Sequence, residues 1–312
     1  MQSMTEHDET EQAVRDLRTL LDLMRWCASQ FNQAGLYYGH GTDNPWDESV
    51  SLVLQSLHLP HDSPQELFAA RLTQNEKTQI VSLARRRVNE RVPLAYLTHQ
   101  SWFAGLPFYV DERVLVPRSP FAELIQGHFA PYLDFEPDTI LDMCTGSGCI
   151  AIAAANAYID AEVDAVDISP DALAVAEINI QDHELNDRVF PIQSDLFENL
   201  SGQCYDLIIA NPPYVDADDM ADLPEEFHHE PQLGLAAGDD GLDLVHTLLR
   251  QGPDFLSERG WLFVEVGNSM VHVQQQYPDL PLVWIDFEQG GHGIFAISNQ
   301  ELKAWLNSNN VK

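Results

Sequence analysis

Residues 140–151 read Ile-Leu-Asp-Met-Cys-Thr-Gly-Ser-Gly-Cys-Ile-Ala, which is an apolar run, a glycine-rich turn and a second apolar run. The first run predicts a buried strand, and the second predicts the start of a helix. Gly146 and Gly148 lack a Cβ, so the backbone can bend tightly there and approach a ligand closely. The N-terminus of the following helix offers unpaired N–H groups and a positive dipole end. These residues therefore predict a strand–turn–helix unit that binds a ligand at its turn.

Beyond Pro137 the sequence alternates between short apolar runs and amphipathic stretches, which is typical of a mostly parallel sheet covered by helices. We expect strands near 138–143, 162–167, 188–193, 205–210, 260–266, 282–286 and 293–298, and helices near 148–158, 170–182, 241–257 and 268–276. The last two strands flank a glycine-rich segment and favour an antiparallel hairpin at the sheet edge. A plain dinucleotide-binding fold lacks such a hairpin, so the pattern predicts an α/β fold of another kind.

The first hundred residues have helical periodicity instead. Helices are expected at 11–31, from Asn44-Pro45 to about 57, from a second start signal at 63–66, and at 76–91. Residues 101–116 predict a β-hairpin that turns at Gly105, and 121–129 predict a helix. The predicted organisation is a flexible N-terminus (1–11), a helical substrate-docking domain (12–98), a linking hairpin (99–118) and a catalytic α/β domain (119–312).

The composition is strongly acidic: 16 Lys and Arg stand against 49 Asp and Glu, for a formal net charge of −33. Such a surface repels phosphate backbones, so direct binding of nucleic acid is not expected. It attracts basic partners and speeds their encounter. General solubility or a salty habitat explains the same charge equally well at this point.

The four cysteines, at positions 27, 144, 149 and 204, have no metal-site spacing, so we predict free thiols and no metal. The polar, acidic start shows no signal peptide, and no apolar run is long enough to span a membrane. We therefore expect a cytoplasmic protein. The adjacent pair His228-His229 is interpreted as part of a solvated loop, because neighbouring histidines rarely face one ion.

Asp167 closes the second expected strand, where a carboxylate can accept hydrogen bonds from both hydroxyls of a ribose. With the glycine pattern of residues 146–151, it also satisfies the dinucleotide-binding fingerprint. A pyrophosphate needs the N–H groups of the turn, whereas S-adenosylmethionine carries an ammonium that Asp142 could hold. Asp142 could equally cap the turn. Asp195, after the third strand, could accept from an adenine amino group or cap the next helix.

Residues 206–214 read Asp-Leu-Ile-Ile-Ala-Asn-Pro-Pro-Tyr, which predicts a short buried strand and a stiff turn at its end. The side-chain oxygen of Asn211 and the carbonyl of Pro212 can accept the two hydrogens of a planar –NH2 group. The ring of Tyr214 can lie against the face of that group. Amine methylation requires such a set and hydride transfer does not, so this turn favours S-adenosylmethionine over a dinucleotide.

Together, Asp142-x-Cys144-x-Gly146-x-Gly148, Asp167 and Asn211–Tyr214 resemble class I S-adenosylmethionine-dependent methyltransferases that modify planar nitrogens. Segments 91–97, 103–118 and 230–242 resemble the HemK-like protein glutamine methyltransferases. Segments 38–48 and 117–123 are similar to the branch that acts on the third large-subunit ribosomal protein. The release-factor branch differs from this chain at 117–123.

The resemblance implies a Rossmann-like, seven-stranded sheet with an antiparallel last strand, beside an N-terminal helical domain. It implies that the chain methylates N5 of a glutamine, with S-adenosylmethionine as cofactor and S-adenosylhomocysteine as product. The implied cofactor-binding residues are Asp142, Cys144, Thr145, Gly146, Ser147, Gly148, Asp167, Asp195, Leu196 and Asn211. The implied catalytic residues are Asn211, Pro212 and Tyr214, and the substrate-binding residues are Asn211, Pro212, Pro213, Tyr214 and Arg118.

The implied partner is a basic ribosomal protein of the large subunit, free or in an early assembly intermediate. The alternatives are glutamine methylation of release factors, methylation of an exocyclic amine in RNA, or a scaffold that only senses adenosine. Glu265, at the end of a predicted strand, has either a structural or a substrate-positioning role. Trp46 and the pair Trp102-Phe103 belong either to the core or to a docking surface.

Overall fold

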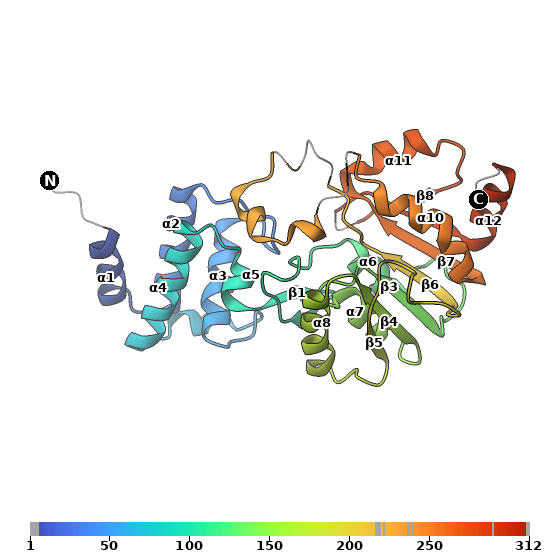
Figure 1. Ribbon diagram of the computed structural model, residues 1–312. Helices are drawn as coiled ribbons and strands as arrows, with labels where there is room; N and C mark the ends of the chain where they lie inside the picture. The colour runs from blue at the N-terminus through green and yellow to red at the C-terminus, as the bar shows by residue number, and fades with distance from the viewer. Residues whose placement is uncertain are drawn as a thin grey trace. The chain divides into compact units, whose positions relative to one another are not determined.

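A computed structural model describes residues 6–215, 220, 222–235, 238, 240–288 and 290–309 (Figure 1). Residues 1–5 of the expected flexible terminus, three positions of the 230–242 motif (236, 237 and 239) and residue 289 lie outside the described residues. The chain divides into two compact units, one of residues 1–100 with 224–229, the other of residues 101–223 with 230–312. Every helix in the described part is too short or too polar to cross a lipid bilayer.

The first unit is helical. It contains α1 (Glu6–Asp16), α2 (Leu20–Ala34), α3 (Pro45–Ser56), the 3-10 helix η1 (Gln65–Ala69), α4 (Gln74–Asn89) and α5 (Leu94–Thr98). Their apolar faces form one core that includes Leu23, Met24, Phe31, Leu52 and Ile80. Residues 6–11 are helical, where we expected a frayed terminus.

Two predicted features of this unit are wrong. The single helix expected at 11–31 is broken, because Thr19 and Asp22 form a capping box that starts a new helix at residue 20. The helix expected after residues 63–66 is only the short η1. The helix does not continue, because the backbone at residues 70–72 pairs with the start of α2 instead. The Ala70 carbonyl accepts from the Leu20 amide, and the Leu72 amide donates to the Arg18 carbonyl.

Pro224–His229 packs within the helical unit although it follows the predicted catalytic turn in sequence. Glu226 is 2% exposed and accepts hydrogen bonds from the amide of Tyr37 at 3.0 Å and from Nη1 of Arg87 at 3.3 Å. Arg87 is itself 1% exposed and pairs with Glu48 at 2.6 Å. A buried charge is costly unless it is paired, so this network holds the segment in place. The ring of His229 donates to the Glu90 carbonyl at 2.8 Å. No local sequence pattern signalled this insertion.

The second unit begins with a short hairpin, β1 (Ser101–Phe103) and β2 (Leu106–Phe108), which turns at Gly105 as predicted. Its second strand ends at Phe108 rather than continuing to residue 116. The chain there forms a turn closed by a hydrogen bond from the Val114 amide to the Asp111 carbonyl, and Arg113 pairs with the Asp111 carboxylate at 2.6 Å.

The main sheet has seven strands: β3 (Thr139–Met143), β4 (Glu162–Asp167), β5 (Val189–Gln193), β6 (Tyr205–Ala210), β7 (Leu256–Glu265), β8 (Val283–Trp284) and β9 (Ile294–Ser298). Their order is β5-β4-β3-β6-β7-β9-β8. Strands β3 to β7 are parallel, and β9 runs antiparallel between β7 and β8. The strand order reverses between β3 and β6, where ligands bind at the carboxyl ends of the strands in such sheets.

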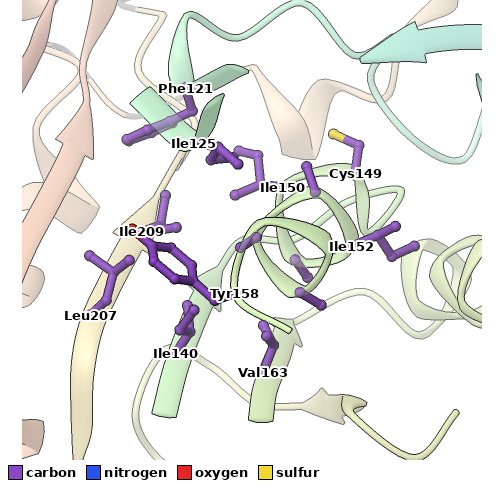
Figure 2. Close-up of a cluster of buried hydrophobic side chains, with 14 of the residues drawn as sticks. Phe121, Ile125, Ile140, Cys149, Ile150, Ile152, Tyr158, Val163, Leu207 and Ile209 are labelled. Atoms are coloured by element: carbon purple, nitrogen blue, oxygen red, sulfur yellow. The ribbon is translucent and has the colours of Figure 1, made fainter. Parts of the chain in front are cut away.

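Helices cover both faces of this sheet (Figure 1). They are α6 (Phe121–Gln126), α7 (Cys149–Ala157), α8 (Pro170–Asp182), α10 (Asp243–Phe255), α11 (Met270–Gln276) and α12 (Asn299–Ser308). The second unit also contains the short 3-10 helices η3 (Gln232–Gly234) and η4 (Gly267–Ser269), and the first unit contains η2 (Glu225–His229). Figure 2 shows one core, in which Ile140, Val163, Leu207 and Ile209 of the strands face Ile150 of α7 and Phe121 of α6. A second core lies with α10 and α12 against β7.

Several elements of the second unit differ from the sequence-based expectation. Helix α6 ends at Gln126, because Gly127 closes it and the two following residues have positive φ. Helix α10 ends at Phe255 and β7 starts at the next residue, several residues earlier than predicted. Helix α12 was not predicted, although Ser298 and Glu301 form a capping box that the Ser-x-x-Glu pattern could have signalled.

Candidate active site

The two glycines of the turn after β3 have different roles. A Cβ at Gly148 would lie 3.2 Å from the Cβ of Ala176, so this glycine lets α7 pack closely against α8. A Cβ at Gly146 would meet nothing within 4 Å. Gly146 has φ +56°, a left-handed conformation that favours glycine. The predicted close approach of a ligand fits Gly146, whereas Gly148 combines a left-handed φ of +78° with a tight contact to α8.

Asp142, near the end of β3, stabilises the glycine-rich turn through hydrogen bonds. Its Oδ2 accepts from the hydroxyl of Thr145 at 2.5 Å and from the amide of Ala151 at 3.0 Å. Its side chain is 0% exposed, and within the described residues its Oδ1 has no hydrogen-bond partner. Burial raises the pKa of this carboxyl to about 7. Of the two roles considered, the structure shows the cap; the binding of an ammonium stays a prediction.

Asp167 closes β4 beside the same turn. Its Oδ2 accepts from the Gly146 amide at 2.9 Å, and its Oδ1 accepts from the Ser169 amide at 2.9 Å. Burial raises the pKa of this carboxyl. Each carboxylate oxygen keeps a second lone pair, so Asp167 can still accept from ribose hydroxyls. The neighbouring Ile168 is 47% exposed and adds an apolar surface that the sequence analysis missed, because an isoleucine after a strand carries no signal of its own.

Negative charges converge on the turn. The pKa of the Cys144 thiol lies well above its usual value because of burial and then because of the carboxylates of Asp167, Asp142 and Asp195. The same three charges would repel the pyrophosphate of a dinucleotide and would attract a ligand that carries an ammonium or a sulfonium. The carboxylates therefore favour a positively charged ligand, and the choice between the two cofactors stays a prediction at this site.

The residues that follow β5 were predicted to contact the adenine of the cofactor. Asp195 is exposed, and the cap of the following turn comes from Ser194, whose hydroxyl accepts from the Asn199 amide at 3.0 Å. Leu196 has φ +45° and is 9% exposed, packed in the core that also contains Phe197. A contact of Asp195 or Leu196 with adenine stays a prediction.

The Asn-Pro-Pro-Tyr turn lies next to the glycine-rich turn. Parallel pairing aligns Ala210 of β6 with Met143 of β3, and the Asn211 amide donates to the Met143 carbonyl at 3.4 Å. The two motifs are therefore neighbours at one edge of the sheet, as expected from their places after parallel strands. Pro212 is buried, and Tyr214 donates its hydroxyl to Glu265 Oε1 at 3.0 Å.

Arg118 is paired with a carboxylate of the same chain. Its guanidinium forms two hydrogen bonds with the carboxylate of Glu230, at 2.6 and 2.8 Å. The same carboxylate accepts from the Val116 amide at 3.0 Å. This bidentate pair joins the segment before α6 to residue 230, which lies after the Asn-Pro-Pro-Tyr turn in the sequence. The predicted contact of Arg118 with substrate stays a prediction.

The fold and this turn define a methyltransferase of the Rossmann-like class, and residues 128–280 match the family model described as the methyltransferase small domain. A protein of Francisella tularensis subsp. tularensis is 44% identical over 301 residues, 96% of each chain. One of Xanthomonas campestris pv. campestris is 51% identical over 296 residues, 95% of this chain and 96% of that one. Both are named ribosomal protein uL3 glutamine methyltransferase, and this chain belongs to their family.

Among solved structures, the catalytic domain of hMettl16 in complex with a MAT2A 3′UTR hairpin aligns with a TM-score of 0.47 and 16% identity, over 72% of this chain and 80% of that chain. So distant a likeness carries no argument about activity. The family confirms the predicted fold class and the ribosomal-protein branch, and it does not favour the release-factor alternative.

Proposed function

We propose that this protein methylates the side-chain amide nitrogen of a glutamine in ribosomal protein uL3, with S-adenosylmethionine as the methyl donor. Both close relatives carry that activity in their names. The observation that carries the proposal is the hydrogen bond from the Asn211 amide to the Met143 carbonyl. This bond holds the segment of Asn211 and Pro212, which we propose as the acceptors for the substrate amide, beside the glycine-rich turn and its carboxylates.

The residues around the turn fit S-adenosylmethionine. The open side of Gly146 leaves room for it, Asp167 has lone pairs for the ribose hydroxyls, and Ile168 offers an apolar surface for the adenine. We propose that Asp195, which is exposed, accepts from the adenine amino group. Because Asp142 is fully buried, we propose that its charge attracts the ammonium from beneath the turn rather than by contact. When bound, the cofactor supplies a methyl group made electrophilic by its sulfonium.

The acceptor turn explains how a poor nucleophile can react. The nitrogen lone pair of an amide is delocalised into its carbonyl, so the task of the protein is alignment. Asn211 Oδ1 and the Pro212 carbonyl each accept one N–H of the glutamine, and the Tyr214 ring packs on the amide plane and excludes water. Alignment of this kind contributes about 7–11 kcal/mol to lowering a barrier.

The same two acceptors also favour the transition state. As the glutamine nitrogen gains a methyl group it becomes positive, and its protons are then held more strongly by Asn211 and Pro212 than in the ground state. The surplus proton leaves to solvent afterwards. The mechanism therefore requires no strong base at the nitrogen.

The net charge of −33 suits a basic substrate. A ribosomal protein without its RNA is attracted to such a surface, whereas an assembled subunit presents phosphates that are repelled. We therefore propose that uL3 is modified free or early in assembly, in the cytoplasm where it is made, and that this protein does not bind nucleic acid directly. We propose that the helical unit and the β1–β2 hairpin bind the substrate protein.

A transfer assay tests the function. The protein is incubated at physiological salt with labelled S-adenosylmethionine and, separately, free uL3, intact large subunits, release factors and ribosomal RNA. We expect label on one glutamine of free uL3 and much slower labelling of large subunits. Label on RNA or on release factors, with none on uL3, would overturn the proposal. Equal rates for free uL3 and large subunits would refute the early timing while leaving the activity intact.

The affinity for S-adenosylmethionine should fall as the pH drops below about 7, because the Asp142 carboxyl has its pKa raised to about 7 by burial. Protonation removes the negative charge that favours the cofactor's positive groups. Since one proton is exchanged, the loss is at most about tenfold per pH unit. Calorimetric titration between pH 5.5 and 8.5 measures it.

The matched variant is Asp142→Asn, whose amide oxygen can still cap the turn through Thr145 and Ala151. It should bind more weakly at pH 8 and lose most of the pH dependence. If the variant keeps the wild-type slope, another group titrates, and the nearby Asp167, whose pKa is also raised, becomes the candidate.

A further inference from the structure

Tyr214 is restrained on three sides. Its hydroxyl donates to Glu265 Oε1 at 3.0 Å, and its carbonyl accepts from the Ser269 hydroxyl at 2.8 Å. Its ring lies against Gly267, where an added Cβ would come within 2.6 Å of the ring carbon Cε2. Gly267 has φ +46°, so both its conformation and this contact call for glycine. The ring therefore has one defined position.

Glu265 is buried, and both of its oxygens are engaged. It is 4% exposed; Oε1 accepts from Tyr214, and Oε2 accepts from the Ser119 hydroxyl at 2.5 Å. The Ser119 oxygen in turn accepts from the Phe121 amide at 3.1 Å, which commits its single proton to Glu265. A carboxylate held in this way orients its two hydroxyl partners.

Sheet register places this carboxylate beside the acceptor turn. Strands β6 and β7 are parallel, and Ala210 is aligned with Val264. Asn211 directly follows Ala210 at the end of β6, and Glu265 directly follows Val264 as the last residue of β7, so the two residues are neighbours at this edge of the sheet. The link from Ser119 through Glu265 to Tyr214 therefore runs from the start of α6 to the end of the Asn-Pro-Pro-Tyr turn.

We infer that Glu265 is a positioning residue for methyl transfer: supported by Ser119, it fixes the Tyr214 ring and thereby the aim of the Asn211 and Pro212 acceptors. Burial raises the pKa of Glu265, and the hydrogen bonds from Ser119 and Tyr214 only partly offset that effect. This inference rests on the proposed function, because its readout is the rate of methyl transfer. The hydrogen bond between Tyr214 and Glu265 thus affects the rate of methyl transfer as well as the stability of the fold.

The test is a double-mutant cycle on the full-length protein with free uL3. Glu265→Ala and Tyr214→Phe should each lower kcat about 10- to 100-fold, since small displacements of a reacting group have effects of this size. The affinity for S-adenosylmethionine should change less than threefold. Glu265→Gln keeps an oxygen that accepts from Tyr214 and should restore most of kcat. The double variant should be no slower than the slower single variant.

The matched control is Tyr205→Phe, because the Tyr205 hydroxyl also donates to a partly buried carboxylate, Asp164, at 2.6 Å. That pair lies at the opposite end of β6, so its loss should lower the melting temperature without changing kcat. Wild-type kcat in Tyr214→Phe would overturn the inference even if Glu265→Ala failed to fold. So would additive effects, or an equal loss of cofactor affinity. Absence of uL3 methylation by the wild-type protein would refute the proposed function instead.

Discussion

Replacing Asn211 with alanine should nearly abolish glutamine methylation while leaving the affinity for S-adenosylmethionine almost unchanged. The side-chain oxygen is one of two acceptors proposed to aim the substrate nitrogen, and the loss of one preorganised polar partner typically lowers kcat by about 10²–10³-fold. The main chain should keep its place, because the Asn211 amide still donates to the Met143 carbonyl. Single-turnover rates on free uL3 and calorimetric titration of the cofactor measure the two quantities.

Asn156→Ala is the matched control for this variant. Asn156 lies on α7, and its side chain donates to the Ile152 carbonyl of the same helix. Removal of that amide should leave both the rate and the cofactor affinity unchanged. An Asn211→Ala enzyme that retained more than about a tenth of the wild-type rate would mean that alignment by this side chain is not the main source of catalysis.

Asp167→Ala should have the largest effect on cofactor binding. Its carboxylate is proposed to accept from the ribose, and it already accepts from the amides of Gly146 and Ser169. Hydrogen bonds to a charged group contribute about 1.5–3 kcal/mol each, so the loss of two to the ribose weakens binding about 10²–10⁴-fold. Titration with S-adenosylhomocysteine isolates this effect, since that ligand lacks the sulfonium charge.

Two variants sharpen this measurement. Asp164→Asn, on the same strand and hydrogen-bonded to Tyr205 rather than to the turn, should bind the cofactor normally. Asp167→Asn keeps an oxygen for one backbone amide and should lose less affinity than the alanine variant. Near-normal binding by Asp167→Ala would contradict the assignment of this carboxylate to the ribose.

Several features were predictable from short stretches of sequence. The apolar run and glycines of residues 140–151 specify a strand, a turn and a helix among neighbours in the chain. The strand with its stiff turn at 206–214 is equally local. Parallel alternation then places both strand ends at one edge of the sheet, which is why the two motifs meet in the structure. The glutamine-methyltransferase family was recognisable from these motifs together with segments 91–97 and 103–118.

Other features depend on residues that are distant in the sequence. Glu265 was recognised as the end of a strand, but its role depends on Ser119 and Tyr214 meeting it across the fold. Gly148 has a left-handed φ of +78°, and the tight contact of this position with Ala176 of another helix could not be read from the sequence. The place of residues 224–229 in the helical unit depends on Arg87, more than a hundred positions earlier.

The sequence by itself thus determined the strand and helix units and the two motifs, because hydrophobic periodicity, caps and stiff turns act between residues close along the chain. Only the tertiary structure decided which carboxylate holds Tyr214, how closely Gly148 packs against α8 and where residues 224–229 pack. Those outcomes follow from strand register, from helix packing and from pairing of buried charges, and all three arise only when distant segments come together.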